Sequence, residues 1–340
     1  MSTFTPTRPP ESLSKNVAPI DAGAHVLGAA FLGGTAALAL VDGRILLLDE
    51  DGAVSEAVAH PDSGALVCAA DGRRLVTGGD DGRVVATSAG GEIETLGDEK
   101  GKWIDAVACG PDGAVAWSAG KSVKARDGKG RVKQWTPPSS VRGLVFAAKG
   151  YRLAVAHNNG ASLWFPNTDA KPDLLEWKGS HLDVMWSPNG RFVVTSMQEN
   201  QLHGWGLPEK QHMRMSGYPA KTRSMSWSHD GLWLATSGAD AVIVWPFQGE
   251  KGPMGKAPRE CGVRPAKVSA VAFHPKALVV AAGYEDGCVL LCRMTDASEL
   301  LVRPADQAGG AISALAWDSG GRRLLFGSRE GAAGLLTLPV

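Results

Sequence analysis

One pattern of short strands recurs along this chain about every 40 residues, and it points to a repeat architecture. Each copy opens with two large or apolar residues two positions apart, separated by a small or medium-sized one. Successive side chains of a strand point to opposite faces, so both faces of this strand are mostly apolar. It is therefore predicted to be buried between neighbouring sheets. The eight pairs, spaced 37 to 46 residues apart, are Ala29 and Phe31, Leu66 and Cys68, Val107 and Cys109, Leu144 and Phe146, Val184 and Trp186, Met225 and Trp227, Val271 and Phe273, and Leu315 and Trp317.

Turn residues separate the strands within each copy. In six copies a glycine stands four positions after the pair, where a turn needs positive φ. A second strand follows, and then a dipeptide such as Asp81-Gly82 or Asn159-Gly160 that favours a two-residue hairpin. Many short, evenly spaced strands predict an all-β propeller. The six glycines are Gly72, Gly113, Gly150, Gly190, Gly231 and Gly321.

The repeat resembles that of the WD40 family over almost all of the chain after Lys15. The resemblance rests on the inner strand, on the Pro-Asp-Gly turn that ends at Gly113, and on the aromatic end of the third strand. The family has a Trp followed by an Asp at the end of the third strand, and this chain departs from it because no Asp follows the matching tryptophans. Residues at the family's tryptophan position are Trp164, Trp205 and Trp245, and its Gly-His pair is loosely kept at Ala24-His25, Ala59-His60 and Ser180-His181.

In that family a His, a Ser or Thr, an Asp and a Trp hydrogen-bond within one blade, and the resemblance therefore implies such networks here. The matching sets in this sequence are incomplete, so we expect that they do not stabilise every blade. They are His181, Thr195 and Trp205, without the Asp, and Ser237, Asp240 and Trp245, without the His.

The number of copies predicts how the propeller closes. Eight inner strands predict eight blades of four antiparallel strands, with seven blades as the alternative, since that number is the commonest in the family. The last copy ends at its third strand, so an N-terminal strand from residues 16–23 is expected to complete the last blade and remove an exposed edge. Residues 1–15 are predicted to be a disordered tail, and residues 16–340 a single propeller domain.

Composition argues against several functions. Lys and Arg number 35, as do Asp and Glu, so nothing in the overall charge attracts nucleic acid or an anionic membrane. No apolar run reaches the roughly 18 residues that a membrane helix needs, and the N-terminus lacks the apolar stretch of a secretory signal. Five scattered cysteines without such a signal predict reduced thiols and a cytoplasmic location.

No catalytic, metal or cofactor motif is found, so we expect no enzyme activity and no cofactor. Cys288 and Cys292 lie four positions apart on one strand, about 13 Å, which is too far for a disulfide between them. Cys261 falls in a predicted loop and is the best candidate for a reactive thiol, although no His and Asn pattern supports catalysis there.

Partner binding is predicted on one rim, where two classes of loop emerge. One class leads into the inner strands and the other joins the second and third strands. Trp, Tyr and Arg, which are enriched at binding hot spots, occur in these loops. Asp105, Arg142 and Arg223 share one slot and are expected to encircle the central channel. The predicted binding residues are Trp103, Asp105, Trp117, Arg142, His157, Arg223, Tyr284 and Arg329.

These observations predict a non-catalytic scaffold that binds protein or peptide partners and is monomeric by itself. The alternatives are a propeller enzyme that acts at the central channel and an RNA- or ribonucleoprotein-associated factor. The longest insertion, residues 249–267, is basic and is expected to be an irregular loop at an outer edge.

Overall fold

The computed structural model describes residues 11–207 and 209–339, which form two compact units. The terminal unit consists of the described residues up to Ala30 together with Tyr218 onward, and the central unit is Phe31–Gly217. Each is built from β-strands, and the helices of the described residues are single 3₁₀ turns: η1 (Ser14–Asn16), η2 (Pro111–Gly113) and η3 (Gln307–Gly309). None of the helices found there is long and apolar enough to cross a membrane.

The central unit contains four hydrogen-bonded sheets, in which the strands follow one another in chain order. The chain enters this unit within the first of these strands. The first sheet is β3 (Val26–Leu32), β4 (Thr35–Leu40), β5 (Arg44–Leu48) and β6 (Val54–Val58); the second is β7 (Ala65–Ala70), β8 (Arg74–Gly79), β9 (Arg83–Ser88) and β10 (Ile93–Asp98); the third is β11 (Ala106–Cys109), β12 (Val115–Ala119), β13 (Ser122–Arg126) and β14 (Val132–Trp135); the fourth is β15 (Gly143–Phe146), β16 (Leu153–Trp164), β17 (Asp173–Trp186), β18 (Phe192–Met197), β19 (Leu202–Gly206) and β20 (Gln211–Met215).

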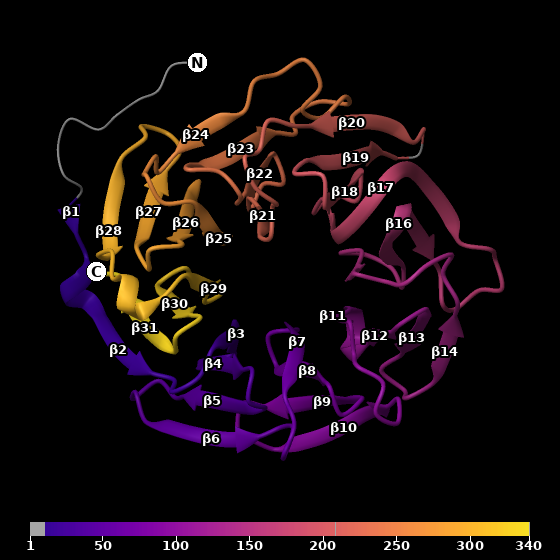
Figure 1. Cartoon of the computed structure of the whole chain (residues 1–340), viewed down its shortest axis with the longest axis horizontal. Coiled ribbons are helices and arrows are strands. Elements are labelled where there is room, and N and C mark those ends of the chain that lie inside the picture. Colours follow the sequence, from indigo (N-terminus) through magenta and orange to yellow (C-terminus); the bar gives the residue numbers. More distant parts are fainter. Residues whose placement is uncertain (1–10, 208, 340) are drawn as a thin grey trace. The chain divides into compact units, whose positions relative to one another are not determined.

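The terminal unit contains three sheets, and two of them include strands from the N-terminal residues (Figure 1). The first is β21 (Met225–Trp227), β22 (Trp233–Thr236), β23 (Val242–Pro246) and β24 (Arg259–Cys261); the second is β25 (Val268–Phe273), β26 (Val279–Tyr284), β27 (Val289–Arg293), β28 (Glu299–Arg303) and β1 (Glu11–Ser12); the third is β29 (Ile312–Trp317), β30 (Arg323–Ser328), β31 (Ala332–Thr337) and β2 (Val17–Asp21).

The prediction of an all-β propeller made of four-stranded antiparallel repeats is confirmed, and each of the eight apolar pairs lies in the first strand of a repeat. The described residues form seven separate sheets, the number of the alternative expectation, so the prediction of eight separate blades is wrong. The difference arises in β17, whose first part pairs with β16 through Asp173–Glu176 and whose second part pairs with β18 through His181–Trp186. This strand ends one repeat and begins the next, so two repeats share one six-stranded sheet.

The expected N-terminal strand is confirmed. In Figure 1, β2 runs beside β31, and the two are antiparallel, with Val17 opposite Leu336 and Asp21 opposite Ala332. The third sheet of the terminal unit therefore has strands from both ends of the chain, as the missing fourth strand of the last repeat required.

Two sequence-based boundaries are wrong. Of the predicted tail, residues 1–10 lie outside the described residues, but Glu11 and Ser12 pair in parallel with Leu300 and Leu301 of β28, and η1 follows. Within the insertion 249–267, Arg259–Cys261 form β24, the outermost strand of its sheet, where only a loop was expected. The extent of a single domain over residues 16–340 stays a prediction.

Neighbouring sheets pack their faces together within each unit, which explains the doubly apolar inner strands. In the central unit, Trp117 of β12 is buried among side chains that include Val76 of β8 and Val107 of β11. In the terminal unit, Val271 of β25 shares a core with Val244 of β23. Burial of such side chains stabilises the fold by about 1.5–3 kcal/mol each.

Serines add hydrogen bonds between inner strands of adjacent sheets in the terminal unit. Ser269 Oγ of β25 donates to the carbonyl of Ile312 in β29 at 2.7 Å. Ser313 Oγ of β29 donates to the carbonyl of Val26 at 2.6 Å. These bonds satisfy carbonyl groups at the edge of each sheet, where no ladder partner exists.

Candidate partner-binding surface

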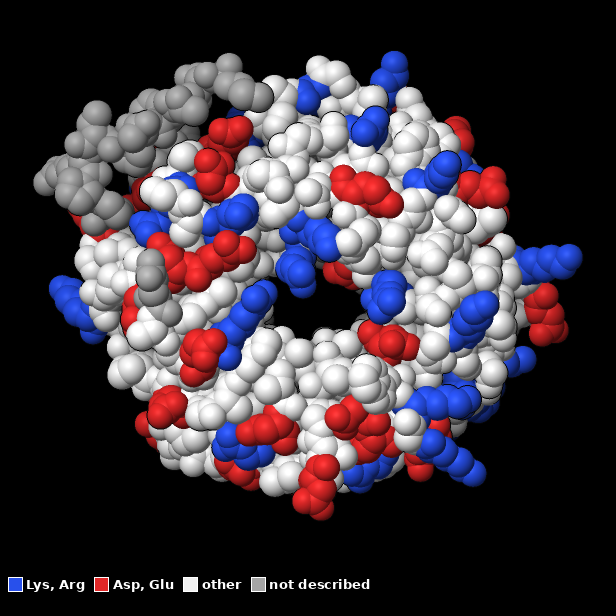
Figure 2. All heavy atoms as spheres, viewed as in Figure 1, with Lys and Arg blue, Asp and Glu red and all other residues white. Residues whose placement is uncertain are grey.

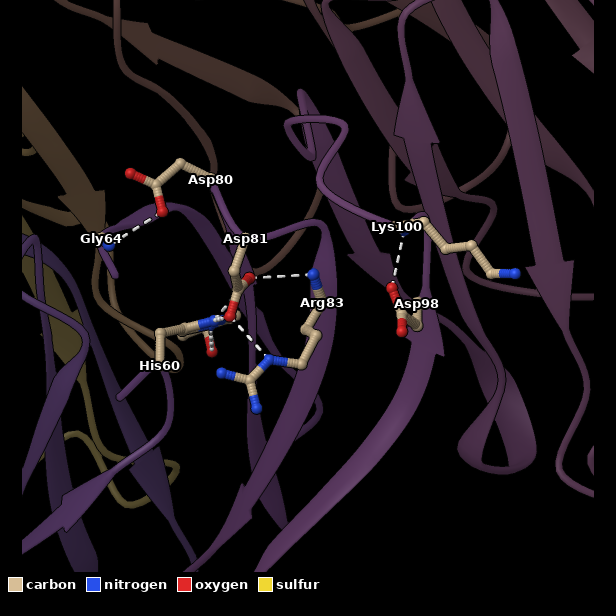
Figure 3. Close-up of polar contacts among 8 residues, drawn as sticks. His60, Gly64, Asp80, Asp81, Arg83, Asp98 and Lys100 are labelled. Carbon is tan, nitrogen blue, oxygen red and sulfur yellow. Dashed lines mark hydrogen bonds and ion pairs between the residues drawn. The ribbon is translucent and has the colours of Figure 1, made fainter. Parts of the chain in front are cut away.

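Trp103 is exposed, as predicted for a binding residue, and it lies in a turn that the sequence determines. We call residues 99–105, between β10 and β11, the Trp103 loop. Lys100 and Gly101 have φ values of 53° and 78°, and the Lys100 amide donates to Asp98 Oδ1 at 2.7 Å (Figure 3). The chain reverses there and leaves the Trp103 side chain 65% exposed.

Backbone hydrogen bonds join the Trp103 loop to the turn between β8 and β9. The amides of Glu99, Gly101 and Ile104 donate to the carbonyls of Gly82, Asp81 and Gly79 at 2.8, 3.2 and 3.2 Å. A side chain at Gly82 would stand 2.7 Å from the Gly101 nitrogen, so only glycine permits this approach. Ile104, next to Trp103, is fully buried and anchors the loop in the core.

Glu99 holds the other side of the Trp103 loop. Its Oε1 accepts a hydrogen bond from Trp117 Nε1 at 2.7 Å, and its two carboxylate oxygens lie 2.7 and 2.9 Å from Lys124 Nζ. Trp117 is only 2% exposed, so its prediction as a surface residue is wrong. Because it is large and apolar, it fills the space between two sheets, and its indole N–H orients Glu99.

Asp105 and Arg142 lie one residue before β11 and β15, as their shared slot predicts. The Asp105 carboxylate accepts from the Gly120 amide at 2.6 Å and so fixes the turn between β12 and β13. Arg142 is exposed, and its amide donates to the Ala156 carbonyl at 3.0 Å. Arg223 belongs to the terminal unit, and the expected circle of these three residues around a channel stays a prediction.

His157 is buried, contrary to its prediction as a rim residue. Its side chain is 1% exposed, with Nδ1 2.9 Å from the Asn158 carbonyl oxygen and Nε2 2.9 Å from Ser162 Oγ. Burial lowers the pKa of His157 and keeps the ring neutral, so Nδ1–H donates and Nε2 accepts. It ties the two halves of β16 together instead of facing a partner.

The terminal unit contains the three remaining predicted residues. Tyr284 is fully buried, its hydroxyl donates to the Gly262 carbonyl, and burial raises its pKa, so its assignment to the surface is also wrong. Arg223 and Arg329 are exposed. Their amides are bonded to Ser237 Oγ at 3.1 Å and to the Ala311 carbonyl at 2.9 Å, which places both on ordered backbone.

A buried network around His60 is more complete than the sequence indicated (Figure 3). His60 Nδ1 lies 3.2 Å from both carboxylate oxygens of Asp81, and Nε2 lies 2.9 Å from Thr77 Oγ1. Since a carboxylate only accepts, Nδ1–H donates to Asp81 and the Thr77 hydroxyl donates to Nε2. The signal was present in Ala59-His60 and Asp81-Gly82, but Thr87 of β9 stands where the family has tryptophan.

Asp81 also binds Arg83, whose amide and Nε donate to it at 2.9 and 2.7 Å. Partial burial alone would raise the pKa of Asp81, but the hydrogen bonds from Arg83 and His60 outweigh it and lower the pKa. The carboxylate therefore stays charged, and it orders the turn against which the Trp103 loop packs.

A tyrosine replaces the expected histidine in the first sheet of the terminal unit. Trp245 Nε1 donates to Tyr218 Oη at 2.6 Å, the Tyr218 hydroxyl bonds Thr236 Oγ1 at 2.6 Å, and Thr236 donates to the Ile243 carbonyl. The set expected from Ser237 and Asp240 does not form, because Ser237 Oγ instead accepts from the amides of Arg223 and Ser224. A search for histidine alone could not find this network.

The other expected set, around His181, forms only in part. His181 Nδ1 lies 2.7 Å from Thr195 Oγ1, and Nε2 donates to the Trp177 carbonyl at 2.9 Å, in place of an Asp. Trp205 Nε1 is buried and has no hydrogen-bond partner among the described residues. The incomplete network predicted there is confirmed.

Asp183, at the inner strand of the same sheet, supplies a pH-dependent prediction. Burial raises its pKa to about 6, because only the Val184 amide, at 2.8 Å, offers a hydrogen bond. The folded chain then holds this proton more tightly than the unfolded chain, so stability falls as pH rises from about 4 to about 6. Asp183→Asn is expected to raise the free energy of unfolding at pH 7 by about 1–2 kcal/mol, after discounting for partial exposure.

Urea unfolding at several pH values measures this effect. The gain from Asp183→Asn is expected to disappear below pH about 4, where both states are protonated. Asp169→Asn, at an exposed carboxylate, is the matched control and should change little at any pH. An equal gain at pH 3.5 and pH 7 would contradict the titration of Asp183.

Comparisons with known proteins agree with this architecture. The family model described as WD40, the WD domain or G-beta repeat, matches residues 210–245, which include the Tyr218, Thr236 and Trp245 network. The crystal structure of the computationally designed Ika8 protein has a similar fold, with a TM-score of 0.77 and 17% identity over 94% of this chain and 98% of that one. The chain is a β-propeller, and its residues 210–245 match the WD40 repeat.

One curated relative of this propeller is "Cell division cycle 20.1, cofactor of APC complex" of Arabidopsis thaliana. It is 26% identical over 97 residues, which is 27% of this chain. The match spans 21% of the relative's length, so its role as a cofactor of that complex is a property of the relative.

Proposed function

We propose that this WD40 propeller is a non-catalytic scaffold and that a protein or peptide partner docks on the Trp103 loop. The observation that carries the proposal is the 65% exposure of Trp103 on a loop whose backbone is held by hydrogen bonds on both sides of it. Large exposed aromatic side chains on ordered backbone are typical of binding hot spots, because they bury much area and lose little conformational entropy. A relative named as a cofactor of a complex supports a role in assembly.

The charges around Trp103 support a partner of a particular chemistry. Lys100, Lys102 and Lys121 are exposed, and within the described chain their ammonium groups have no ion-pair partner. Lys121 lies in the turn that the Asp105–Gly120 bond joins to the Trp103 loop. We therefore infer a partner with an apolar residue that packs on the indole and acidic residues that face the lysines.

The wider surface also suits a folded protein or a peptide. Figure 2 shows basic and acidic side chains interspersed on the displayed face. Such mixed charge favours recognition of protein groups over a uniformly charged phosphate backbone. A cytoplasmic location, a monomeric state in isolation and independence of cofactors stay predictions.

Trp103→Ala is expected to weaken partner binding by about 30-fold, the effect of losing a central aromatic hot spot. Its effect on Tm should be within about 1 °C, because the side chain is mostly exposed. Affinity purification with tagged full-length chain from the source cells identifies the partner, and binding of that purified partner to wild type and variant gives the ratio.

Val132→Ala is the control, since Val132 is 49% exposed on β14 of the same unit. A photo-reactive amino acid at position 103 should cross-link the same partner, and one at position 132 should not. Equal affinity of the Trp103→Ala and Val132→Ala variants, or an RNA in place of a protein partner, would overturn the proposal.

A further inference from the structure

Two cysteines from neighbouring sheets of the terminal unit come together at one point. Cys261 is the last residue of β24, opposite Val242 of β23. Cys292 lies in β27 of the next sheet, opposite Val280 and Glu299. Cys261 packs against the buried cluster that contains Cys292, and both thiols are free. In the sequence Cys292 lies near Cys288 and far from Cys261, so this contact comes from the packing of the sheets.

The backbone after Cys261 is pressed against Cys292. A side chain at Gly262 would stand 3.0 Å from Cys292 Sγ, and its φ of +65° also favours glycine. The Gly262 carbonyl accepts from the Tyr284 hydroxyl, and its amide donates to Glu299 Oε1 at 3.2 Å. This segment is therefore held in place from both sides, next to the Cys292 side chain.

The two thiols differ in access. Cys261 lines a cavity of about 420 Å³, together with Arg259, Glu260 and Arg293. Cys292 is fully buried behind it, and its hydrogen bond to Cys261 and its burial raise its pKa. A small oxidant in the cavity reaches Cys261 first, and Cys292 is placed to react second.

We propose that Cys261 and Cys292 are a peroxide-sensitive pair that forms a disulfide between adjacent sheets. In the first step the Cys261 sulfur, as thiolate, attacks a peroxide oxygen, the O–O bond breaks, and Cys261 becomes a sulfenic acid while the peroxide is reduced to water or an alcohol. In the second step Cys292 sulfur attacks the sulfenic sulfur, the S–O bond breaks, and the thiol proton leaves with hydroxide as water.

The cross-link would join residues 31 positions apart and tie β24 to the next sheet. Constraining a loop of this size in the unfolded chain is expected to raise Tm by about 5 °C. Since thiolate is the reactive form, the reaction should be faster at higher pH.

The test treats the folded full-length chain with hydrogen peroxide, blocks the remaining thiols by alkylation, and maps the peptides by mass spectrometry. We expect the loss of two free thiols out of five, a Cys261–Cys292 cross-linked peptide, and the rise in Tm, all reversed by a dithiol reductant. Cys261→Ser and Cys292→Ala should each abolish the cross-link and the rise in Tm, with folding checked by circular dichroism. Cys288→Ser, at the neighbouring buried thiol, should keep both.

Three results would overturn the proposal. One is oxidation that stops at sulfenic or sulfinic acid on Cys261. Another is a cross-link that includes Cys288 instead of Cys292. The last is loss of the two thiols only after the chain has unfolded.

Discussion

His60→Ala is expected to lower the free energy of unfolding by about 3 kcal/mol, the largest effect of any single change considered. The ring is fully buried between Asp81 and Thr77, so its removal leaves a cavity and takes a hydrogen-bond partner from the Thr77 hydroxyl (Figure 3). Asp81 keeps its bonds to Arg83, which limits the loss. Urea unfolding and calorimetry measure the change.

A double-mutant cycle with Thr77→Val separates the network from simple loss of volume. A coupling of about 1–2 kcal/mol between His60 and Thr77 is expected for a direct buried hydrogen bond. His229→Ala, at an exposed histidine, is the control and should change stability by less than about 0.5 kcal/mol. Additive effects of the two substitutions would show that the network does not act as a unit.

Hydrogen exchange would show a local consequence of the same change. The Trp103 loop donates backbone hydrogen bonds to carbonyl groups of residues 79–82, and the Asp81 side chain orders that turn. We expect His60→Ala to speed exchange of the Gly101 and Ile104 amides, and to weaken partner binding without any change in the loop sequence.

Tyr218→Phe is expected to lower the free energy of unfolding by about 2 kcal/mol, although it removes a single oxygen atom. That oxygen accepts from Trp245 and donates to Thr236, and all three side chains are buried. Without it, the indole N–H of Trp245 is left in the core with no acceptor, which costs more than the bond itself contributes.

Tyr151→Phe is the matched control in the other unit. The Tyr151 hydroxyl is buried with no hydrogen-bond partner among the described residues, and burial raises its pKa to about 12. Its removal is expected to leave stability unchanged or to raise it by up to about 1 kcal/mol. Equal losses from both substitutions would contradict the assigned role of Tyr218, because the Tyr151 hydroxyl makes no hydrogen bond among the described residues that the substitution could remove.

The fold was predictable because the repeat encodes it at every level. The alternating apolar pair identifies each inner strand, and the turn glycines identify where strands end, as at Gly113, where φ is +77°. The pairing of β2 with β31 could be predicted by counting the strands of the last repeat. That repeat ends at its third strand, so the edge of its sheet needs a fourth strand from elsewhere in the chain. The fusion of two repeats through β17 was not predictable, because extended residues 178–180 look like a connection in the sequence.

The binding surface was less predictable, because side-chain exposure depends on packing between sheets. Trp103 and Trp117 have the same chemistry and lie in nearby segments, yet one is 65% and the other 2% exposed. Trp117 belongs to β12, whose faces meet a neighbouring sheet, whereas Trp103 follows a turn with φ > 0 that turns it outward. The predictions that His157 and Tyr284 are exposed were wrong for the same reason as that for Trp117, because packing buries both side chains.

The pairing of β2 with β31 has a consequence for synthesis. On a ribosome that adds about 5–20 residues per second, Val17–Asp21 emerge roughly 15–60 s before Ala332–Leu336, their only ladder partners in the described chain. During that interval these N-terminal residues wait without a partner while the central unit, which is continuous in sequence, can already fold. Nascent chains stalled before residue 332 should therefore protect the central unit from protease while leaving residues 17–21 open to cleavage.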